Sequence, residues 1–388
     1  MTRPGVLVHV QHLLGIGHLK RAAAISRALV EAGARVTVAS GGVAEPRVDF
    51  AGAEVVQLPP AVAADAAFSA VLDAAGAPID AAWKAARTRQ LLGLFDRVAP
   101  DILLIEMYPF GRRQFRFELL PLLEHARAGA RPPLVACSVR DVLIARSKPE
   151  RSLESAALVR RHFDLVLVHG DPRLIAFGTT FPAAESIADR LHYTGYVTDL
   201  ALSAAAPDRR KDGEVLVSAG GGAVGMPLLT AAIAAKSRSS LAGRPWRIIA
   251  GNNLPAADYA RLAAAAAPDP GLTLERFRPD FAKLLQNCHI SVSQGGYNTV
   301  MELIATRTPA VVVPFAEGQE SEQSLRAGLL AEKGVLEVLA PDGLTPAALA
   351  AAIDRAAAKG PAAIEIDLDG ARKSAALLLR ALAERSPG

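Results

Sequence analysis

Residues 291–327 read SVSQGGYNTVMELIATRTPAVVVPFAEGQESEQSLRA. An apolar strand at 288–292 ends at a glycine turn, Gly295-Gly296, after which the pattern predicts a helix that carries Glu302. A β-branched run at 311–313 predicts another strand, and a polar loop ending in Glu322-Gln323 follows it. Strand, glycine turn, helix and strand in this order are typical of a parallel α/β sheet, which binds ligands at the carboxyl ends of its strands.

This ordered run resembles the nucleotide-sugar site of GT-B glycosyltransferases, particularly those of family 28. The shared pattern is a glycine turn, a helix with a glutamate, a strand ending in Pro-Phe and an acidic loop ending in Glu-Gln. The glycine pair by itself fits an ordinary turn, whereas the whole run favours the family. The resemblance implies a ribose-binding Glu302 and a sugar-binding Glu322-Gln323 pair. The donor-site candidates of this run are Gln294, Gly295, Gly296, Asn298, Thr299, Glu302, Glu322 and Gln323.

Size and composition bound the class of protein. The chain has 388 residues, which exceeds the usual size of one hydrophobic core and predicts two domains. Hydrophobic residues make up 51%, which favours a soluble globular α/β protein. Lys and Arg outnumber Asp and Glu by 43 to 39, a net charge of +4. So small and unclustered an excess argues against a nucleic-acid partner.

Cysteine usage and the absence of long apolar runs indicate the compartment. Cys137 and Cys288 lie within or beside apolar runs, so we expect buried free thiols rather than disulfides or metal ligands. The first residues, MTRPGVLVHVQH, lack the apolar core of a signal peptide, and no run approaches the roughly twenty apolar residues of a membrane span. We expect a cytoplasmic protein, with peripheral association at the inner face of a membrane left open.

The amino-terminal segment predicts a βαβ unit. Residues 6–10 (VLVHV) form a buried strand, a loop with Gly15 and Gly17 follows, and a helix runs from His18 to about Ala32 before a strand at 35–39. The loop G-I-G-H lacks the third glycine of the dinucleotide fingerprint, and no acidic residue follows the second strand. A Rossmann dehydrogenase is therefore disfavoured.

His18 is the candidate catalytic base. An imidazole near its ordinary pKa of about 6.5 is suited to proton abstraction at neutral pH. By resemblance, the first loop of a GT-B enzyme faces the interdomain cleft and carries the base that acts on the acceptor hydroxyl, and His18 matches that place. A helix-capping histidine without chemistry fits the position equally well.

Other strands of the first domain also end in polar residues. Strands are predicted at 101–105, 134–139 and 165–168, and buried parallel strands place ligand groups at their carboxyl ends. The Ala-rich segment 65–97 is expected to be helical. The acceptor-side candidates are Gly15, Gly17, Glu106, Arg113 and Arg140, for which capping and surface roles are equally compatible.

A second series of elements follows a linker. Residues 204–213 (AAAPDRRKDG) have linker composition and place the boundary at about residue 199. A strand at 214–218 then leads through a glycine-rich turn into a helix at 226–236, an arrangement that directs N–H groups toward a diphosphate. The turn resembles the phosphate loop of the family. By the same resemblance, the segment after strand 272–277 contacts the base. The donor-site candidates added here are Gly220, Gly221, Gly222, Phe277 and Arg278.

These patterns and the resemblance together predict an α/β protein of GT-B fold, with two doubly wound Rossmann-like domains facing a cleft. Residues 1–198 would form the acceptor-side domain and residues 199–370 the nucleotide-sugar domain. Residues 371–388 would form a helix that packs back on the first domain.

The resemblance implies a glycosyltransferase that moves a hexosyl or N-acetylhexosaminyl group from a nucleoside diphosphate sugar, with UDP the expected nucleotide, to a hydroxyl acceptor with inversion. Backbone N–H groups would stabilise the leaving diphosphate, so neither a metal nor another cofactor is expected. The expected partners are the donor and a hydroxyl acceptor such as a lipid or a secondary-metabolite glycan.

Two departures from the family indicate an acceptor other than that of the peptidoglycan enzymes. The first loop is G-I-G-H rather than a fuller glycine-rich loop, and segment 106–113 has no counterpart there. Two alternatives remain on this fold. One is a UDP-N-acetylglucosamine 2-epimerase, which converts its sugar nucleotide without an acceptor, and the other is a non-catalytic nucleotide-sugar-binding subunit. The order of motifs in 291–327 favours the transferase.

Overall fold

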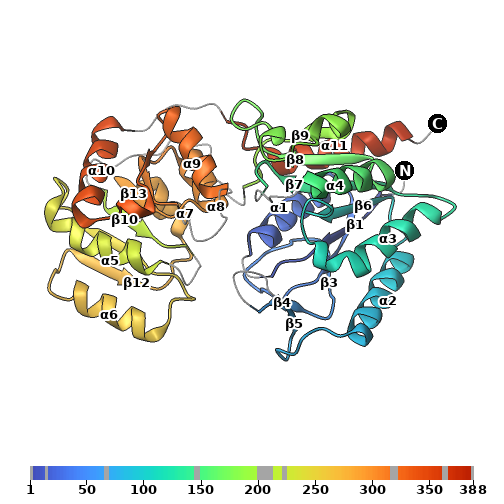
Figure 1. Ribbon diagram of the computed structural model, residues 1–388, viewed down its shortest axis with the longest axis horizontal. Helices are drawn as coiled ribbons and strands as arrows, with labels where there is room; N and C mark the ends of the chain where they lie inside the picture. The colour runs from blue at the N-terminus through green and yellow to red at the C-terminus, as the bar shows by residue number, and fades with distance from the viewer. Residues whose placement is uncertain are drawn as a thin grey trace. The chain divides into compact units, whose positions relative to one another are not determined.

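The computed structural model describes residues 3–13, 16–64, 70–143, 149–198, 213–220, 225–314, 322–360 and 366–385. The chain divides into two compact units (Figure 1). The first comprises Met1–Asp199 together with Asp367–Gly388, and the second comprises Leu200–Ile366. The sequence placed the boundary after residue 198 and the return of the chain at 371.

The first unit is a doubly wound parallel sheet. Within the described residues its strand order is β3-β2-β1-β6-β7-β8-β9, and every neighbouring pair is parallel. The order reverses between β1 and β6, the place where open α/β sheets bind ligands. Its main elements are β1 (Gly5–Val10), α1 (Gly17–Glu31), β2 (Arg35–Ser40), β3 (Glu54–Gln57), α2 (Ala81–Val98), β6 (Ile102–Glu106), α3 (Arg116–Ala128), β7 (Leu134–Arg140), α4 (Pro149–His162), β8 (Leu165–His169), β9 (Leu191–Tyr193) and α11 (Gly370–Arg385).

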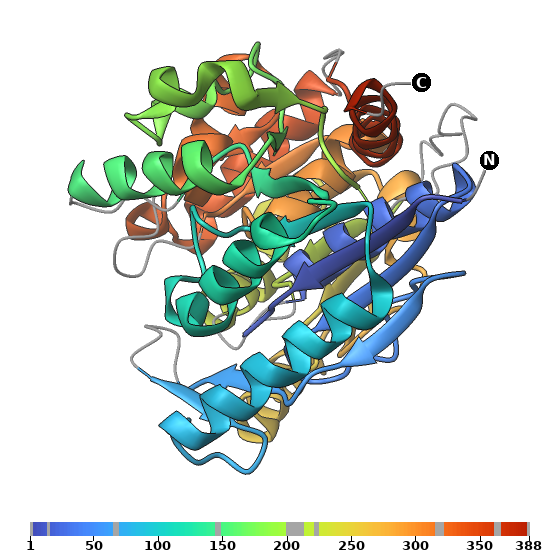
Figure 2. The same cartoon turned by 90° about the vertical axis from the view of Figure 1, so that its right-hand side faces the viewer.

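Side-chain alternation along β1 divides the core of this unit between the two faces of the sheet. Val6 and Val8 pack with residues of α1 and α11, whereas Leu7 packs with residues of α2, α3 and α4. Figure 2 shows the long helix α2 lying along its face of the sheet. A strand buried on both faces reads as a continuous apolar run, which is why VLV at 6–8 predicted it.

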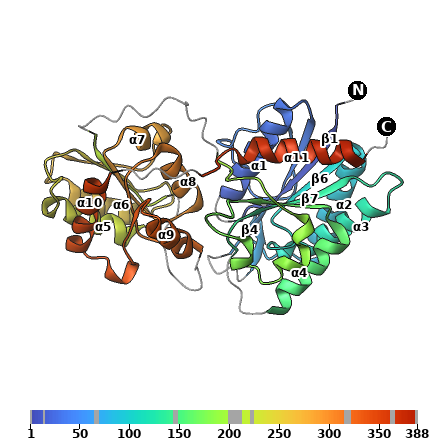
Figure 3. The same ribbon diagram turned by 90° about the horizontal axis from the view of Figure 1, so that it is seen from above.

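Helix α11 returns the chain to the first unit and lies beside α1 (Figure 3). Two backbone hydrogen bonds join the returning segment to Tyr196. The Tyr196 N–H donates to the Asp367 carbonyl at 2.7 Å, and the Gly370 N–H donates to the Tyr196 carbonyl at 3.1 Å. A Cβ at Gly370 would lie 2.4 Å from the carbonyl oxygen of Gly195, so glycine is required at this close approach.

The expectation of a continuous helix over 65–97 was wrong. Strands β4 (Ala61–Ala63) and β5 (Val71–Asp73) form an antiparallel hairpin, and α2 begins only at Ala81. The Asp73 carboxylate accepts from the N–H groups of Ala75 and Ala77, both at 2.9 Å, and thereby stabilises a turn. The turn that Asp73 stabilises and the proline that follows it, Pro78, outweigh the helical propensity of alanine in this segment. Residues 65–69 lie outside the described residues.

The second unit is a smaller sheet of the same kind. Within the described residues its strand order is β12-β11-β10-β13-β14-β15, again parallel throughout. Helices α5 and α10 pack on one face, and Figure 1 shows α8 and α9 on the other. Its elements are β10 (Val215–Ser218), α5 (Met226–Ala235), β11 (Trp246–Ile249), α6 (Ala256–Ala266), β12 (Leu272–Glu275), α7 (Phe281–Asn287), β13 (Ile290–Ser293), α8 (Tyr297–Thr306), β14 (Ala310–Val312), α9 (Glu322–Glu332), β15 (Glu337–Val338) and α10 (Pro346–Lys359).

The predicted α/β class with two Rossmann-like domains is therefore confirmed. Cys137 and Cys288 are buried free thiols, as expected. Of the helices in the described part of the chain, none combines the length and apolarity needed to cross a membrane.

Candidate active site

The first unit brings together two residues that the sequence singled out separately. His18 lies in the first turn of α1, and Glu106 is the last residue of β6, the neighbour of β1. His18 Nδ1 lies 3.0 Å from Glu106 Oε1. Arg21 Nη2 lies farther from Nδ1, at 3.2 Å. Because the closer partner, the ionised carboxylate, only accepts hydrogen bonds, we assign the proton to Nδ1 and the lone pair to Nε2. The His18 side chain is 15% exposed and is otherwise buried.

The charge state of this pair is set by burial and by arginines. Burial would raise the pKa of Glu106, but the Arg21 charge and the hydrogen bond from His18 outweigh it and hold the pKa far below its usual range. Burial and the Arg112 charge lower the pKa of His18 well below its ordinary value, although Glu106 opposes them. At neutral pH the site therefore holds a carboxylate and a neutral imidazole, the form required of a general base.

Arg21 is a site residue that the sequence reasoning missed. It follows His18 by one helical turn on α1, and its Nη2 is ion-paired with Glu106 Oε1. The i, i+3 spacing of His18 and Arg21 placed both on one helix face and was the available signal. Burial of Glu106 and Arg21, 2% and 4% exposed, means that neither charge is stable without the other.

Two further polar residues, also missed, extend the site across the sheet. Ser138 of β7 donates a hydrogen bond to Glu106 Oε2, and its Oγ lies 2.8 Å from Nε2 of His169 at the end of β8. All three come from the carboxyl ends of adjacent strands. Glu106 and Ser138 are register partners, so their side chains point to the same face.

The remaining acceptor-side candidates take different places. Gly17 is the first residue of α1, and Gly15 lies outside the described residues. Arg113 is ion-paired with Glu154 of α4, which Arg116 also contacts, so it belongs to a half-exposed ion cluster. Arg140 is half-buried at the end of β7, in register with His169. The structure thus joins Glu106, but not Arg113, to His18.

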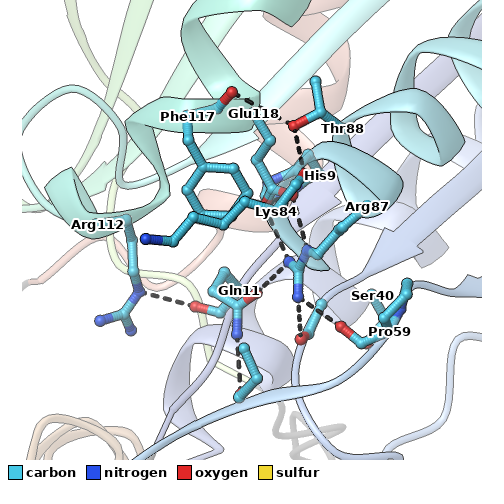
Figure 4. Close-up of polar contacts among 12 residues, drawn as sticks. His9, Gln11, Ser40, Pro59, Lys84, Arg87, Thr88, Arg112, Phe117 and Glu118 are labelled. Atoms are coloured by element: carbon cyan, nitrogen blue, oxygen red, sulfur yellow. Dashed lines mark hydrogen bonds and ion pairs between the residues drawn. The ribbon is translucent and has the colours of Figure 1, made fainter. Parts of the chain in front are cut away.

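A second buried polar network holds the carboxyl end of β1 (Figure 4). The Arg87 guanidinium of α2 forms two parallel bonds with the Glu118 carboxylate of α3, at 2.7 and 2.9 Å, and both side chains are fully buried. The same guanidinium donates to the carbonyls of Gly41 and Pro59 and to the side-chain oxygen of Gln11. It therefore fixes the loops that follow β1, β2 and β3.

In the second unit, the two glycine loops leave neighbouring strands. β10 and β13 are adjacent, with Ser218 and Ser293 in register at their carboxyl ends. Gly220 has a positive φ of 67° and follows β10, while Gly221 and Gly222 lie outside the described residues. Gly295 and Gly296 follow β13, and Gly296 caps α8. Helix α8 and Gly220 therefore follow adjacent strands at the same edge of the sheet.

Gln323 lies against the second glycine loop. A Cβ at Gly295 would lie 3.4 Å from Gln323 Cβ and 3.2 Å from Val312 Cγ1, so the glycine permits this approach. By contrast, a Cβ at Gly296 would meet nothing within 4 Å. The structure places the half-buried side chains Gln294, Asn298, Thr299 and Glu302 on or beside α8, and the Glu322 side chain lies outside the described residues.

The candidate base-binding segment follows β12. Phe277 is 51% exposed, which is unusual for an aromatic side chain. Arg278 forms two bonds with the Asp280 carboxylate, at 2.8 and 2.7 Å. The Arg278 hydrogen bonds lower the pKa of Asp280 to about 2. Arg278 is thus held by its neighbour, and Phe277 is the side chain presented to solvent. No group of three or more His, Cys, Asp or Glu side chains arranged to hold a metal occurs among the residues that the structure describes.

Comparison with protein families and curated sequences locates the similarity in the second half of the chain. Residues 249–377 match the model of the glycosyltransferase family 28 C-terminal domain. A UDP-N-acetylglucosamine–N-acetylmuramyl-(pentapeptide) pyrophosphoryl-undecaprenol N-acetylglucosamine transferase of Prochlorococcus marinus (strain MIT 9301) is 33% identical over 60 residues, 16% of each chain. The transferase of the same name from Synechocystis sp. is 33% identical over 83 residues, 21% of this chain and 23% of that one. The matches thus span less than a quarter of these relatives.

Solved structures match almost the whole chain at low identity. Acinetobacter baumannii MurG superposes with a TM-score of 0.63 at 16% identity and covers 97% of this chain and 100% of its own. The calicheamicin glycosyltransferase CalG4 superposes with a TM-score of 0.62 at 17% identity, covering 99% and 95%. The fold of this chain is therefore that of the GT-B glycosyltransferases, and its residues 249–377 are similar to the carboxyl-terminal domain of glycosyltransferase family 28.

Proposed function

We propose that this protein transfers a hexosyl or N-acetylhexosaminyl group from a nucleoside diphosphate sugar, UDP being the expected nucleotide, to a hydroxyl acceptor, with inversion and without a metal. The observation that carries the catalytic part is the pairing of His18 with Glu106. The family match and the adjacent glycine loops support the nucleotide-sugar part.

In the proposed reaction, His18 Nε2 removes the proton of the acceptor hydroxyl. The hydroxyl oxygen attacks the anomeric carbon of the donor, the bond from that carbon to the diphosphate oxygen breaks, and the configuration inverts. Glu106 holds the imidazole through Nδ1 and stabilises the imidazolium that forms. General-base assistance of this kind contributes a factor of about 10² to 10⁴ in rate.

The donor would bind to the second unit. The N–H groups at the start of α8 and around Gly220 are suited to the charge of the departing diphosphate. Glu302 would accept hydrogen bonds from the ribose, Gln323 would contact the sugar, and Phe277 would pack on the base.

The test has two arms, binding and turnover. Thermal unfolding is followed with UDP, GDP, TDP and ADP and their sugars, each with and without EDTA. A ligand at 100 times its Kd stabilises the native state by about 2.7 kcal/mol. We expect one nucleotide to raise the Tm, independently of EDTA, and Glu302→Ala to abolish the rise. No shift with any nucleotide would contradict the proposal.

Turnover separates the transferase from its alternatives. With the nucleotide that binds, we expect sugar transfer to a panel of hydroxyl acceptors, and at most slow hydrolysis without one. Conversion of the donor sugar to its C2 epimer with no acceptor would instead identify an epimerase. A protein that binds the nucleotide with no turnover, in which His18→Ala changes nothing, would be a binding subunit.

A further inference from the structure

We infer that Ser138 and His169 are positioning residues of the proposed reaction, which act through Glu106 on the base His18. The inference rests on the proposed function for its kinetic consequence, but its structural part stands independently. A hydrogen-bonded chain runs from His18 through Glu106, Ser138 and His169 to Thr194. It crosses three adjacent strands and ends in the segment after β9.

The contacts along this hydrogen-bonded chain are short and buried. Ser138 Oγ lies 2.8 Å from His169 Nε2, and His169 Nδ1 lies 2.9 Å from Thr194 Oγ1. Ser138, His169 and Thr194 are 1%, 0% and 2% exposed, so water does not compete for their hydrogen bonds. Such a buried network restricts each member to one orientation, because each alternative leaves a polar group without its partner.

The ionised carboxylate fixes the direction of every bond in the chain. Glu106 only accepts, so the Ser138 hydroxyl donates to Oε2. The Ser138 oxygen then accepts from His169, which places the His169 proton on Nε2. His169 Nδ1 is left as an acceptor, so the Thr194 hydroxyl donates to it. The same carboxylate places the His18 proton on Nδ1, so one charge sets opposite tautomers in the two histidines.

The surrounding charges keep this arrangement at working pH. The charges that act on His18 are those of Arg21 of α1 and Arg112 of the loop after β6, and Arg21 also acts on Glu106. Burial and then the Glu106 charge raise the pKa of the Cys137 thiol of β7. Burial first, and then the Arg21 charge, lower the pKa of His169 to about 3, against an opposing effect of Glu106. His169 therefore stays neutral and cannot become a competing cation beside Glu106.

The chain explains what holds the second oxygen of Glu106. Arg21 and His18 both approach Oε1, so without another donor the carboxylate could rotate about its Cγ–Cδ bond. The Ser138 hydroxyl occupies Oε2 and blocks this rotation, and His169 in turn keeps the hydroxyl aimed at Oε2. The Nε2 of His18 is thereby presented in one direction.

Ser138→Ala tests the kinetic consequence. We expect kcat to fall about tenfold while the KM for the nucleotide sugar stays the same, because a charge-assisted hydrogen bond is lost outside the donor site. Without this donor Glu106 becomes more basic and attracts the His18 imidazolium more strongly. The acid limb of the pH dependence of kcat/KM should therefore move to higher pH. Ser138→Thr, which keeps the hydroxyl, should restore both values toward those of the native chain.

Ser374→Ala is the matched control. The Ser374 hydroxyl is equally buried and donates to Gly370 O at 2.6 Å. It lies in α11, outside the hydrogen-bonded chain that runs from His18 to Thr194. A Ser138→Ala variant whose kcat and acid limb match those of Ser374→Ala would overturn the inference. If Ser138→Ala does not fold, two variants of His169 replace it. His169→Leu should behave as predicted for Ser138→Ala, whereas His169→Gln, which keeps an N–H donor, should behave like the native chain.

Nitrogen NMR of the full chain, labelled with ¹⁵N-histidine, is independent of activity. At pH 7 we expect the His18 signal to show a proton on Nδ1 and the His169 signal a proton on Nε2, assigned with His18→Gln and His169→Gln. Reversed tautomers would overturn the inference even in an active transferase. If the protein shows the expected tautomers but no transferase activity, the hydrogen-bonded chain from His18 to Thr194 is supported and only the proposed function is contradicted.

Discussion

The neutral imidazole of His18 is the residue-scale feature on which the proposed chemistry depends. A histidine near a helix start is common, and its chemistry follows from its neighbours. Glu106 supplies the acceptor that fixes the tautomer, and Arg21 keeps that acceptor ionised. Because burial disfavours the imidazolium, His18 is unprotonated at neutral pH and is ready to accept a proton.

Glu106→Gln should convert the dyad to an inactive form. The amide N–H group would donate to His18 Nδ1, move the imidazole proton to Nε2 and remove the base, so kcat should fall by a factor of about 10² to 10⁴. Since the carboxylate raises the pKa of His18, the residual activity should have its acid limb at lower pH, opposite to the effect of Ser138→Ala. Glu54→Gln, an exposed change in β3, is the control, and equal activity of the two variants would contradict this role.

His169 should make the first unit less stable at acid pH. Its pKa of about 3 in the folded state lies below the ordinary value of about 6.5, so between these values the unfolded chain binds the extra proton. The free energy of unfolding therefore falls as the pH falls, by about 2 kcal/mol from pH 7 to pH 5. Urea titrations at the two pH values measure it. His169→Gln should flatten the difference, and an unchanged slope would be inconsistent with a buried neutral histidine.

At the scale of elements, the packing of α2 against α3 also fixes the loops at the carboxyl ends of the strands. The buried Arg87–Glu118 pair ties both helices to the carboxyl end of β1 through Gln11, and to the loops after β2 and β3 through two carbonyls (Figure 4). A Cβ at Gly41 would lie 2.3 Å from Arg87 Nη2, so the guanidinium fills the place of that side chain. The network therefore sets the backbone beside the loop that leads to His18.

Glu118→Gln should destabilise the first unit by about 3 to 5 kcal/mol, because it leaves the Arg87 charge buried without its counter-ion. The double variant Arg87→Met/Glu118→Leu removes both charges and should cost less than Glu118→Gln. Arg97→Ala breaks an exposed pair with Glu54 and should cost less than about 1 kcal/mol. Urea unfolding gives all three values. A Glu118→Gln cost as small as that of the exposed pair would refute the assignment.

At the scale of the whole molecule, two units with separate cores make up the chain. The second unit is continuous in sequence, whereas the first is completed by the last helix. Ala375 and Leu378 of α11 pack into the same core as Val6, Val8 and Ile25. The first unit therefore depends on a segment that is synthesised after the entire second unit.

Leu378→Ala should lower the stability of the first unit and leave the second unit unchanged. Leu378 is fully buried, and its truncation should cost about 2 to 5 kcal/mol. The two tryptophans report separately, Trp83 in α2 and Trp246 in β11, so labelling with 5-fluorotryptophan gives one fluorine NMR signal per unit. Leu153→Ala, the same change at a 64% exposed position, is the control. Equal losses at both tryptophans would show that the units unfold together.

The sequence by itself determined the fold class, because buried parallel strands read as apolar runs and the turns between strand and helix need glycine. It also identified His18 and Glu106 as separate candidates, since each stands at the end of a strand or the start of a helix. Only the tertiary structure decided that they pair and that Arg21, Ser138 and His169 join them. Hydrogen bonds between residues 31 to 88 positions apart along the chain depend on strand order and register, and single-sequence patterns report only local periodicity. For the same reason the Arg87–Glu118 network was not foreseen, and strand β5 (Val71–Asp73) was mistaken for helix.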